Sequence, residues 1–486
     1  MYFIGLDVGT TGTKAVVTDE GGITLGSAYK DYPLHSDGVR VTQNADDWWS
    51  AAVYAVRGAT KDIDKSKIAA ISLSTQAASM LCTDKDGNAI SEVITWMDSR
   101  ASAEARELSD AIGAERIYKI SGWLPNPVLD AAKILWLRDN EPRLFAAAHK
   151  FVTTLEFMNM KLCRRCVIDP TNAAMRQLYD ITSGKWSEPV LSYIGITEDR
   201  LPEVLPIGAD LGTLCPEAAE ELSLPCGVHI YNGAHDQYCA AVGCGAVEAG
   251  DMLLATGTTW VILGITSSPL YTDNHISPGI HPTKGLYGAL ASIVSAGSAL
   301  NWYRNICGGD FASLDAEASI CRDSAASLFV LPYVCGAGFP HMRPDLRGAM
   351  FGLDAGHKRG DIARALMEGV AFEAAGVLDG FAAHGMKIDR LMMTGGAARS
   401  ELWTGIVQSV TGCEIYRMRE KETCCMGAAM TAAVSCGAFA DYKGCKKVMV
   451  KADAAPAASK SDIEFYREKR ARYEKLAAGL KDFYTV

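Results

Sequence analysis

The chain has 486 residues, which exceeds the size at which one hydrophobic core keeps growing, so two domains are expected. Its composition, 49% hydrophobic and 21% charged, is that of an ordinary globular enzyme. The formal charge of −10 argues against binding to nucleic acid or to an anionic membrane surface, because both need clustered Lys and Arg.

The N-terminus and the cysteines indicate where the protein works. Residues 1–7 read as a β-strand and not as a signal peptide, and no apolar run is long enough to cross a bilayer. Fifteen cysteines, an odd number, are scattered along the chain, which favours free thiols in a reducing compartment. Cys163 and Cys166 have CxxC spacing, but no second Cys or His pair stands at metal-ligand spacing, so a zinc or redox site is not favoured. We expect a cytoplasmic protein with no nucleic-acid or membrane partner.

The chain opens with a predicted β-hairpin. Residues 3–6 and 14–18 have the pattern of strands, and Gly9 and Gly12 free the backbone in the turn between them. Strands and amphipathic helices then alternate, which predicts an α/β fold. In the first half, strands are expected at 68–74, 80–84 and 228–231, and helices at 48–59, 102–112, 130–138 and 238–243.

A second hairpin of the same kind is predicted midway along the chain, at 251–263. Both hairpins carry Gly-Thr-Thr at their tip, at 9–11 and 257–259, which predicts one structural repeat in each domain. The stretch before the second hairpin lacks clear periodicity, so the domains are expected at 1–246 and 247–486. In the second half, a strand is expected at 391–393 and helices at 361–383, 400–410, 426–434 and 461–483.

The two Gly-Thr-Thr turns are candidate phosphate sites, because such turns line a concavity with backbone amides. The chain has no GxxxxGK[ST] sequence, no GxGxxG and no protein-kinase motif set, so neither a P-loop NTPase nor a protein kinase is indicated. Two turns facing each other could hold the phosphates of a nucleotide from both sides, although either turn alone could be a plain turn. Asp7, at the end of the first strand, would add a carboxylate suited to a hydrated Mg²⁺.

Asp236 is the candidate catalytic base. It stands between a short predicted strand and a helix of small residues, shortly before the second hairpin. An acid at such a position can simply cap the helix. It can also accept the proton of a substrate hydroxyl while that oxygen attacks a γ-phosphoryl group. The neighbouring phosphate turn favours the second interpretation, and His235 is expected to be structural.

Five motifs, in order along nearly the whole chain, resemble the FGGY family of carbohydrate kinases. The resemblance implies two actin/hexokinase-like (ribonuclease H-like) ATPase domains with a cleft between them, and an ATP-dependent kinase acting on a small sugar or polyol. The form of the last motif is closest to that of xylulokinases. The motifs are Ile4–Lys14, Trp96–Arg100, Lys133–Asn140, Gly348–Leu353 with Asp361–Glu368, and Gly395–Trp403.

The resemblance implies a role for each matching residue. Asp7 would act near Mg²⁺, and Asp236 would be the proton acceptor. Residues that would bind ATP are Thr10, Thr11, Gly12, Lys14, Gly257, Thr258, Gly297, Asn301, Gly395, Gly396 and Ser400. Residues that would bind the sugar are Gln76, Ala77, Ala78, Trp96, Asp98 and Gln237. From the residues alone, Trp96 could equally pack in the core and Gln76 could bond to backbone.

The expected sugar site departs from well-known members of the family. Where xylulokinases carry Gln-Met-His and glycerol kinases carry Gln-Arg-Glu, this chain has Gln76, Ala77 and Ala78. Alanine side chains cannot form hydrogen bonds to substrate hydroxyls, so D-xylulose and glycerol are disfavoured as native substrates. Two alternatives stay open: a non-catalytic sugar sensor on the same fold, and an ATP-driven machine of the actin or chaperone type. A homodimer is a candidate assembly.

Overall fold

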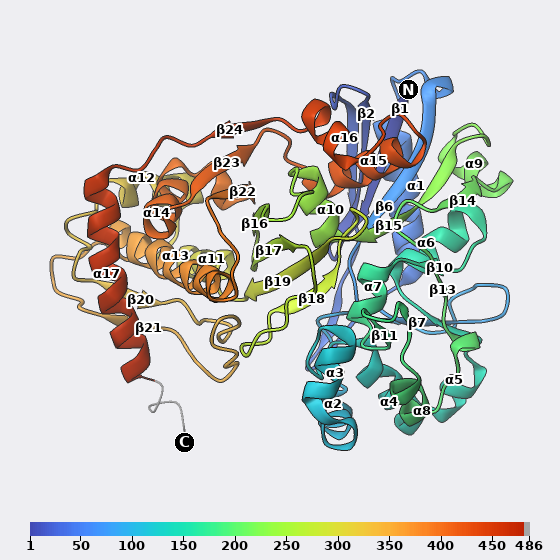
Figure 1. Ribbon diagram of the computed structural model, residues 1–486, viewed down its shortest axis with the longest axis horizontal. Coiled ribbons are helices and arrows are strands. Elements are labelled where there is room, and N and C mark those ends of the chain that lie inside the picture. The colour runs from blue at the N-terminus through green and yellow to red at the C-terminus, as the bar shows by residue number, and fades with distance from the viewer. Residues whose placement is uncertain (481–486) are drawn as a thin grey trace.

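The structure is a computed structural model that describes residues 1–480, and it has two parts, each built round a mixed β-sheet. Figure 1 shows the N-terminal elements, blue to green, on one side and most of the C-terminal elements, yellow to red, on the other. Strands and helices alternate through both parts. The predicted α/β class is therefore confirmed.

The first sheet has six strands. In spatial order they are β14 (Asp210–Thr213), β15 (His229–His235), β6 (Ile68–Thr75), β1 (Tyr2–Val8), β2 (Gly12–Asp19) and β3 (Thr24–Asp31). β1, β2 and β3 form an antiparallel meander, and β6 runs parallel to β1 with β15 parallel to β6. The predicted first hairpin is β1 with β2, and it sets Asp7 opposite Lys14. β15 runs on past the predicted strand end, as far as His235.

The second sheet has seven strands and repeats this topology. In spatial order they are β18 (Ser277–Ile280), β19 (Tyr287–Ile293), β17 (Trp260–Thr266), β16 (Met252–Thr256), β22 (Arg390–Gly395), β23 (Glu414–Met418) and β24 (Ala452–Ala454). β16, β17 and β19 form the antiparallel meander, and β22 and β23 follow as the parallel pair. The Gly-Thr-Thr repeat seen in the sequence therefore marks a repeated three-plus-two arrangement of strands.

Helices cover both sheets. In the first part they are α1 (Ala45–Ala59), α2 (Ser102–Leu108), α3 (Ala114–Ser121), α4 (Asp130–Asn140), α5 (Pro142–Ala147), α6 (Thr154–Cys163), α7 (Pro170–Met175), α8 (Glu188–Ile194) and α9 (Pro216–Leu222). The later helices are α10 (Asp236–Gly243), α11 (Gly297–Cys307), α12 (Phe311–Ser319), α13 (Arg359–Ala383), α14 (Glu401–Thr411), α15 (Thr423–Ser435), α16 (Tyr442–Met449) and α17 (Lys460–Gly479).

Short strand pairs complete the chain outside the two large sheets. They are β4 (His35–Asp37) with β5 (Arg40–Gln43) and β8 (Val93–Ile94), β7 (Leu81–Thr83) with β9 (Lys150–Val152), β10 (Val167–Ile168) with β13 (Glu203–Val204), β11 (Tyr179–Asp180) with β12 (Lys185–Trp186), and β20 (Phe329–Leu331) with β21 (Ala349–Phe351).

Most predicted helices are present within a few residues of their expected ends, and two differ in an informative way. The helix expected at 102–112 ends at Leu108 and continues as a π turn to Gly113, whose positive φ of 96° ends the regular pattern. The helix expected from residue 238 begins at Asp236, directly after β15. Of the helix expected at 461–483, the last three residues lie outside the described part of the chain.

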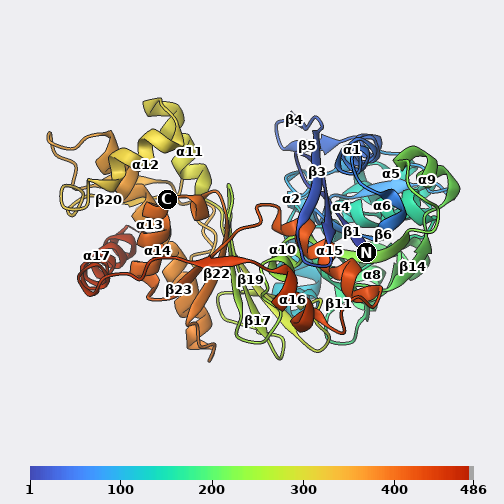
Figure 2. The same cartoon turned by 90° about the horizontal axis from the view of Figure 1, so that it is seen from above.

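Two helices exchange sides between the parts. α10 follows the first sheet but packs in the cluster that holds Leu253 and Leu263 of the second sheet. α15 lies between β23 and β24 of the second sheet along the chain but packs against Phe3 and Ala70 of the first sheet, and Figure 2 shows α15 and α16, in red, beside the blue strands. The two helices also lie directly against each other. The parts are therefore joined by packing as well as by the chain.

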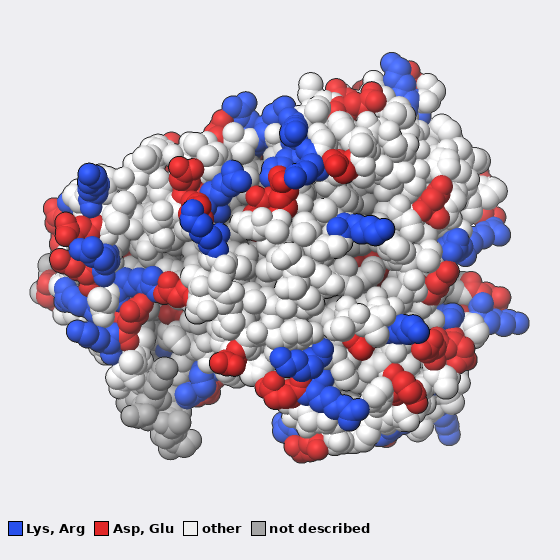
Figure 3. Space-filling model, in the orientation of Figure 1, with Lys and Arg blue, Asp and Glu red and all other residues white. Residues whose placement is uncertain are grey.

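The described residues contain neither a disulfide bond nor a helix that could span a membrane. All fifteen cysteines lie within the described residues and all are free thiols. Within residues 1–480, each helix is too short or too polar to serve as a membrane span. On the face shown in Figure 3, Lys and Arg are interspersed with Asp and Glu.

Candidate active site

Carboxylates gather where the strands of the first sheet end. β1, β6 and β15 are parallel, so their carboxyl ends share one edge of the sheet. Asp7 Oδ1 accepts a hydrogen bond of 2.6 Å from Ser74 Oγ on β6. Asp236 follows β15 as the first residue of α10. Burial, together with the negative charges of Asp236 and Glu422, raises the pKa of Asp7 to about 7, although the hydrogen bond from Ser74 and the charge of Lys14 lower it. Asp7 and Asp236 therefore lie close enough to interact.

The turn between β1 and β2 is held from its carbonyl side. Gly9 N donates to Gly12 O at 3.1 Å, and the hydroxyl of Tyr29 donates to Thr11 O at 3.1 Å. Gln43 Nε2 donates to Thr10 O at 2.6 Å. These hydrogen bonds to the carbonyls fix the shape of the turn. Gln43 has no signal in the local sequence and was missed by the sequence analysis.

Lys14 forms an ion pair that the sequence did not predict. Its Nζ lies 2.5 Å from Glu422 Oε2, and both side chains are about a third exposed or less. Burial lowers the pKa of Lys14, but the hydrogen bond and charge of Glu422 outweigh that and raise it. Glu422 directly precedes α15, so its position on the first sheet follows from the exchanged helix. The phosphate contact expected of Lys14 stays a prediction.

The expected sugar residues lie in different environments. Gln76 is 2% exposed, and its Nε2 donates to Gln43 Oε1 at 3.1 Å. Ala77 and Ala78 are also buried. Trp96 is 41% exposed, and its indole nitrogen donates to Thr10 Oγ1 at 2.8 Å, which brings it beside the turn between β1 and β2. Trp96 is therefore not a core residue.

Asp98 has a structural task in the structure. Its two carboxylate oxygens accept hydrogen bonds from the Arg100 guanidinium, at 2.9 and 2.7 Å, and from Val41 N at 2.7 Å. Burial works against the charged form, yet these donors hold the pKa of Asp98 below its ordinary value. Both carboxylate oxygens therefore already have hydrogen-bond donors within the protein. The sugar contact expected of Asp98 stays a prediction.

A large pocket on the second sheet gathers most of the residues expected to bind nucleotide. Its volume is about 1050 Å³, and the predicted residues that line it are Gly257, Thr258, Gly297, Asn301, Gly396 and Ser400. A Cβ on Gly297 would lie 2.2 Å from Gly257 O, so only glycine fits at that position. Gly395 lies beside the pocket with a positive φ of 94°, and Gly396 N donates to Thr256 O at 2.8 Å.

Residues of α12 and α14 form another wall of this pocket. Ser400 caps α14 by accepting a 2.9 Å hydrogen bond from Trp403 N, and its hydroxyl donates to Asp315. Phe311 lines the same pocket and is 45% exposed. Asp315 and Phe311 were missed by the sequence analysis, since neither belongs to a recognisable motif.

Comparison with known proteins gives the family. Residues 2–243 match the N-terminal domain of the FGGY family of carbohydrate kinases, and residues 252–436 match its C-terminal domain. The chain belongs to the FGGY family of carbohydrate kinases. It is therefore a phosphotransferase whose acceptor is a carbohydrate hydroxyl, and the resemblance found in its motifs is confirmed.

Relatives of this FGGY kinase include enzymes for different substrates. The xylulose kinase of Bacillus subtilis is 25% identical, over all of this chain and 98% of the relative. The gluconokinase of Bacillus subtilis is 26% identical, over 88% of this chain and 86% of the relative. Among solved structures, ligand-bound xylulose kinase from Lactobacillus acidophilus has a TM-score of 0.93 at 24% identity, over 100% of this chain and 99% of that one. This likeness confirms the actin/hexokinase-like fold.

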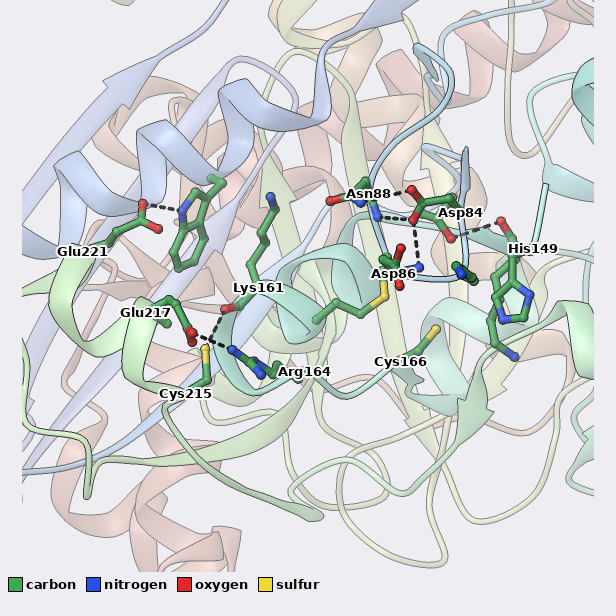
Figure 4. A pocket seen from close by; sticks show the side chains of 17 residues that line it. Asp84, Asp86, Asn88, His149, Lys161, Arg164, Cys166, Cys215, Glu217 and Glu221 are labelled. Atoms are coloured by element: carbon green, nitrogen blue, oxygen red, sulfur yellow. Dashed lines mark hydrogen bonds and ion pairs between the residues drawn. The ribbon is translucent and has the colours of Figure 1, made fainter. Parts of the chain in front are cut away.

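A second cavity lies away from these residues. It has a volume of about 660 Å³ and lies between α1, α6, α9 and the turn at 84–88. Figure 4 shows Arg164 directed at Glu217, and their atoms are 2.6 Å apart. Lys161 Nζ lies 3.7 Å from Asp46 Oδ1. No residue with an expected role lines this cavity, so it is separate from the candidate active site. Arg164 and Lys161 already have acidic partners.

Proposed function

We propose that this FGGY kinase transfers the γ-phosphoryl group of ATP to a hydroxyl of a small sugar or polyol, with Asp236 as the catalytic base. The proposal rests on one arrangement: Asp236 and Asp7 lie together at the strand ends of the first sheet, while a glycine-walled pocket lies on the second. The domains at 1–246 and 247–486 would bind mainly the sugar and mainly the nucleotide, respectively.

The pocket suits a nucleotide in size and in its groups. Ligand pockets typically have volumes of roughly 300–1,000 Å³, and this one has about 1050 Å³. Gly257 and Gly297 let the backbone of the turn approach a phosphate chain without steric hindrance. Thr258 would bind phosphate from the second sheet, opposite Thr10 and Thr11 on the first.

The residues round Asp7 suit Mg²⁺, which prefers carboxylate and water oxygens. The carboxyl of Asp7 is buried beside another carboxylate, which is why its pKa is raised, and a divalent cation would favour its charged form. Bound there, Mg²⁺ would offset the negative charge of the transferring phosphoryl group.

The residues of the chain then perform two tasks. Asp236 accepts the proton of the substrate hydroxyl as its oxygen attacks the γ-phosphorus, and the bond to the leaving ADP oxygen breaks. Lys14 and the turn amides stabilise the charge on the phosphate oxygens. His235 Nε2 lies 2.9 Å from Asp236 Oδ1, but that oxygen accepts no hydrogen bond from the described residues, which leaves it available to a substrate hydroxyl.

The decisive experiment is Asp236→Asn. We expect ATP binding to be retained and sugar-dependent ADP release to fall by roughly 10²–10⁴-fold, the usual contribution of a positioned base. Exposed Asp62→Asn is the control and should leave the rate unchanged. An undiminished rate in Asp236→Asn would overturn the assignment, and ATP hydrolysis without an acceptor would favour an ATP-driven machine instead.

The cellular setting is part of the proposal. Fifteen free thiols suit a reducing cytoplasm. A homodimer stays a prediction.

A further inference from the structure

Gln76 presents an oriented hydrogen-bond acceptor. The indole N–H of Trp48 can only donate, and it lies 3.2 Å from Gln43 Oε1, which fixes that amide with its Nε2 on Thr10 O. Gln43 Oε1 therefore also receives the NH₂ group of Gln76, at 3.1 Å. The remaining oxygen, Gln76 Oε1, is buried and has no hydrogen-bond partner among the described residues.

Asn172 presents a second acceptor in the same way. Asp169 accepts hydrogen bonds from the backbone amides of Thr171 and Asn172, so its carboxylate is an acceptor here. Asn172 Nδ2 donates to Asp169 Oδ1 at 2.6 Å, which leaves Asn172 Oδ1 as the free end of the amide. This oxygen is buried and has no partner within residues 1–480. A buried acceptor without a donor is costly, so a ligand hydroxyl is favoured at each of these oxygens.

Both acceptors lie beside the proposed base. β6 and β15 pair with Thr75 opposite His235, and the next residues along the two strands are Gln76 and Asp236. Asn172 Nδ2 lies 3.4 Å from Thr75 Oγ1. Gln76 and Asp236 therefore follow neighbouring strands at the same end of this pair, and the amide of Asn172 contacts Thr75 at that end.

The buried cation nearest the two alanines is fully occupied. Lys133 Nζ donates to Ala78 O at 2.6 Å, to Thr95 O at 2.9 Å and to Ile94 O at 3.2 Å. An ammonium group has three protons, so these carbonyls take all of them. Lys133 thus stabilises the backbone at Ala78 and has no proton left for a substrate carboxylate.

Two further cations near the site already have anionic partners. Lys14 pairs with Glu422 at 2.5 Å, and Arg100 Nη2 pairs with Asp98 Oδ2 at 2.7 Å. Charged partners of this kind form the stronger class of hydrogen bonds. A negatively charged sugar would therefore have to disrupt an ion pair to gain a counter-charge.

We propose that the sugar site selects neutral polyhydroxylated substrates, ketoses or polyols, over sugar acids, with Gln76 and Asn172 accepting hydrogen bonds from substrate hydroxyls. This inference rests on the proposed kinase function. The hydroxyls of either kind of sugar can donate to these acceptors, but a sugar acid adds a carboxylate, whose oxygens only accept and whose negative charge is unfavourable beside acceptor groups and the carboxylate of Asp236. The relatives do not decide the matter, because they include both xylulose kinases and gluconokinases.

The test compares neutral and acidic sugars of equal carbon number in an ADP-release assay. The pairs are D-ribulose with D-ribonate, xylitol with D-xylonate, and D-fructose with D-gluconate. We expect at least one neutral sugar to be phosphorylated, with kcat/KM at least tenfold above that of its acid. Preference for an acid overturns the inference while the kinase function stands. Absence of ADP release with every compound overturns the proposed function, and the selectivity falls with it.

A variant then tests the acceptor itself. Gln76→Leu should raise KM for the preferred neutral sugar about tenfold, with the KM for ATP unchanged, and so reduce the neutral-to-acid ratio. The matched control is Gln408→Leu, which removes another buried glutamine, bonded through Nε2 to Pro456 O at 3.1 Å and remote from the site. Retained ATP binding shows that Gln76→Leu is folded. An unchanged neutral-to-acid ratio in that folded variant overturns the role of Gln76.

Discussion

Some residues of the candidate site lower the free energy of unfolding of this kinase. Asp7 is the clearest case, because β1 carries it into a region shared with Asp236 and Glu422. Its folded-state pKa of about 7 lies above the ordinary value of 3.8. A carboxyl with a raised folded pKa favours folding only while it is protonated. Its charged form therefore destabilises the unliganded protein as the pH rises from about 4 through 7.

Asp7→Asn should therefore stabilise the protein and inactivate it. At pH 8 we expect the free energy of unfolding to rise by about 2–4 kcal/mol, since each pKa unit corresponds to about 1.4 kcal/mol. The gain should shrink as the pH falls toward 4, where the carboxyl is neutral in both states. Urea unfolding at pH 8 and pH 5 measures it, with Asp62→Asn as the control. An equal or lower stability at pH 8 would contradict the electrostatic account.

At the scale of elements, the exchanged helices decide how the first sheet is built. α15 packs so closely on β1 that a Cβ on Gly5 would lie 1.8 Å from Cys425 O. A Cβ on Gly427 of α15 would lie equally close to Cys239 O of α10. A glycine at each of these two contacts lets backbone meet backbone, and the close approach of α15 to β1 brings Glu422 to Lys14.

Gly5→Ala tests this contact. Because the methyl group would meet a rigid backbone carbonyl, we expect a loss of about 3 kcal/mol in the free energy of unfolding. Gly405→Ala is the control, since a Cβ there would meet nothing within 4 Å inside α14. That substitution should raise stability by about 0.5–1 kcal/mol through helix propensity. Urea unfolding of the two variants beside wild type measures both effects, and a Gly5→Ala protein as stable as wild type would refute the close packing.

Across the whole molecule, the two sheets carry separate candidate sites. The carboxylates lie on the first sheet, and the pocket proposed for the nucleotide lies on the second. A further contact links the parts, where the hydroxyl of Tyr118 on α3 donates to Ile276 O before β18 at 2.6 Å. Phosphoryl transfer requires both parts to hold their ligands at once. Because the two proposed sites lie on different sheets, the binding of each ligand can be measured separately.

Gly297→Ala should separate the two events. Its Cβ would lie 2.2 Å from Gly257 O, so the turn that is proposed to hold phosphate must shift. We expect ATP affinity to fall at least tenfold, with the affinity for the preferred neutral sugar unchanged. Calorimetric titration with each ligand measures this, and Gly227→Ala, which meets nothing within 4 Å, is the control. An equal loss of sugar affinity would show that the two sites are not separate.

The local features of this protein follow from its amino-acid sequence. Both Gly-Thr-Thr hairpins, the alternation of strands and helices, and the position of Asp236 at the end of a strand are present as predicted. Such features depend on residues near one another in the chain, where hydrophobic periodicity and turn chemistry are visible. The family motifs are also short runs of neighbouring residues, and their order along the chain indicated the order of the two domains.

The pairs of residues that meet from distant parts of the chain could be identified only in the folded protein. Glu422 pairs with Lys14 across 408 positions of sequence, and Asn172 bonds Thr75 across 97. The exchange of α10 and α15 and the orientation of the Gln76 amide have the same origin. These contacts arise from the packing of whole elements, whose relative positions leave no periodic signal in the residues that meet. That is why Asp236 and Gln76 could be named as candidates from the sequence, whereas the orientation of the Gln76 amide and the position of Asn172 could not.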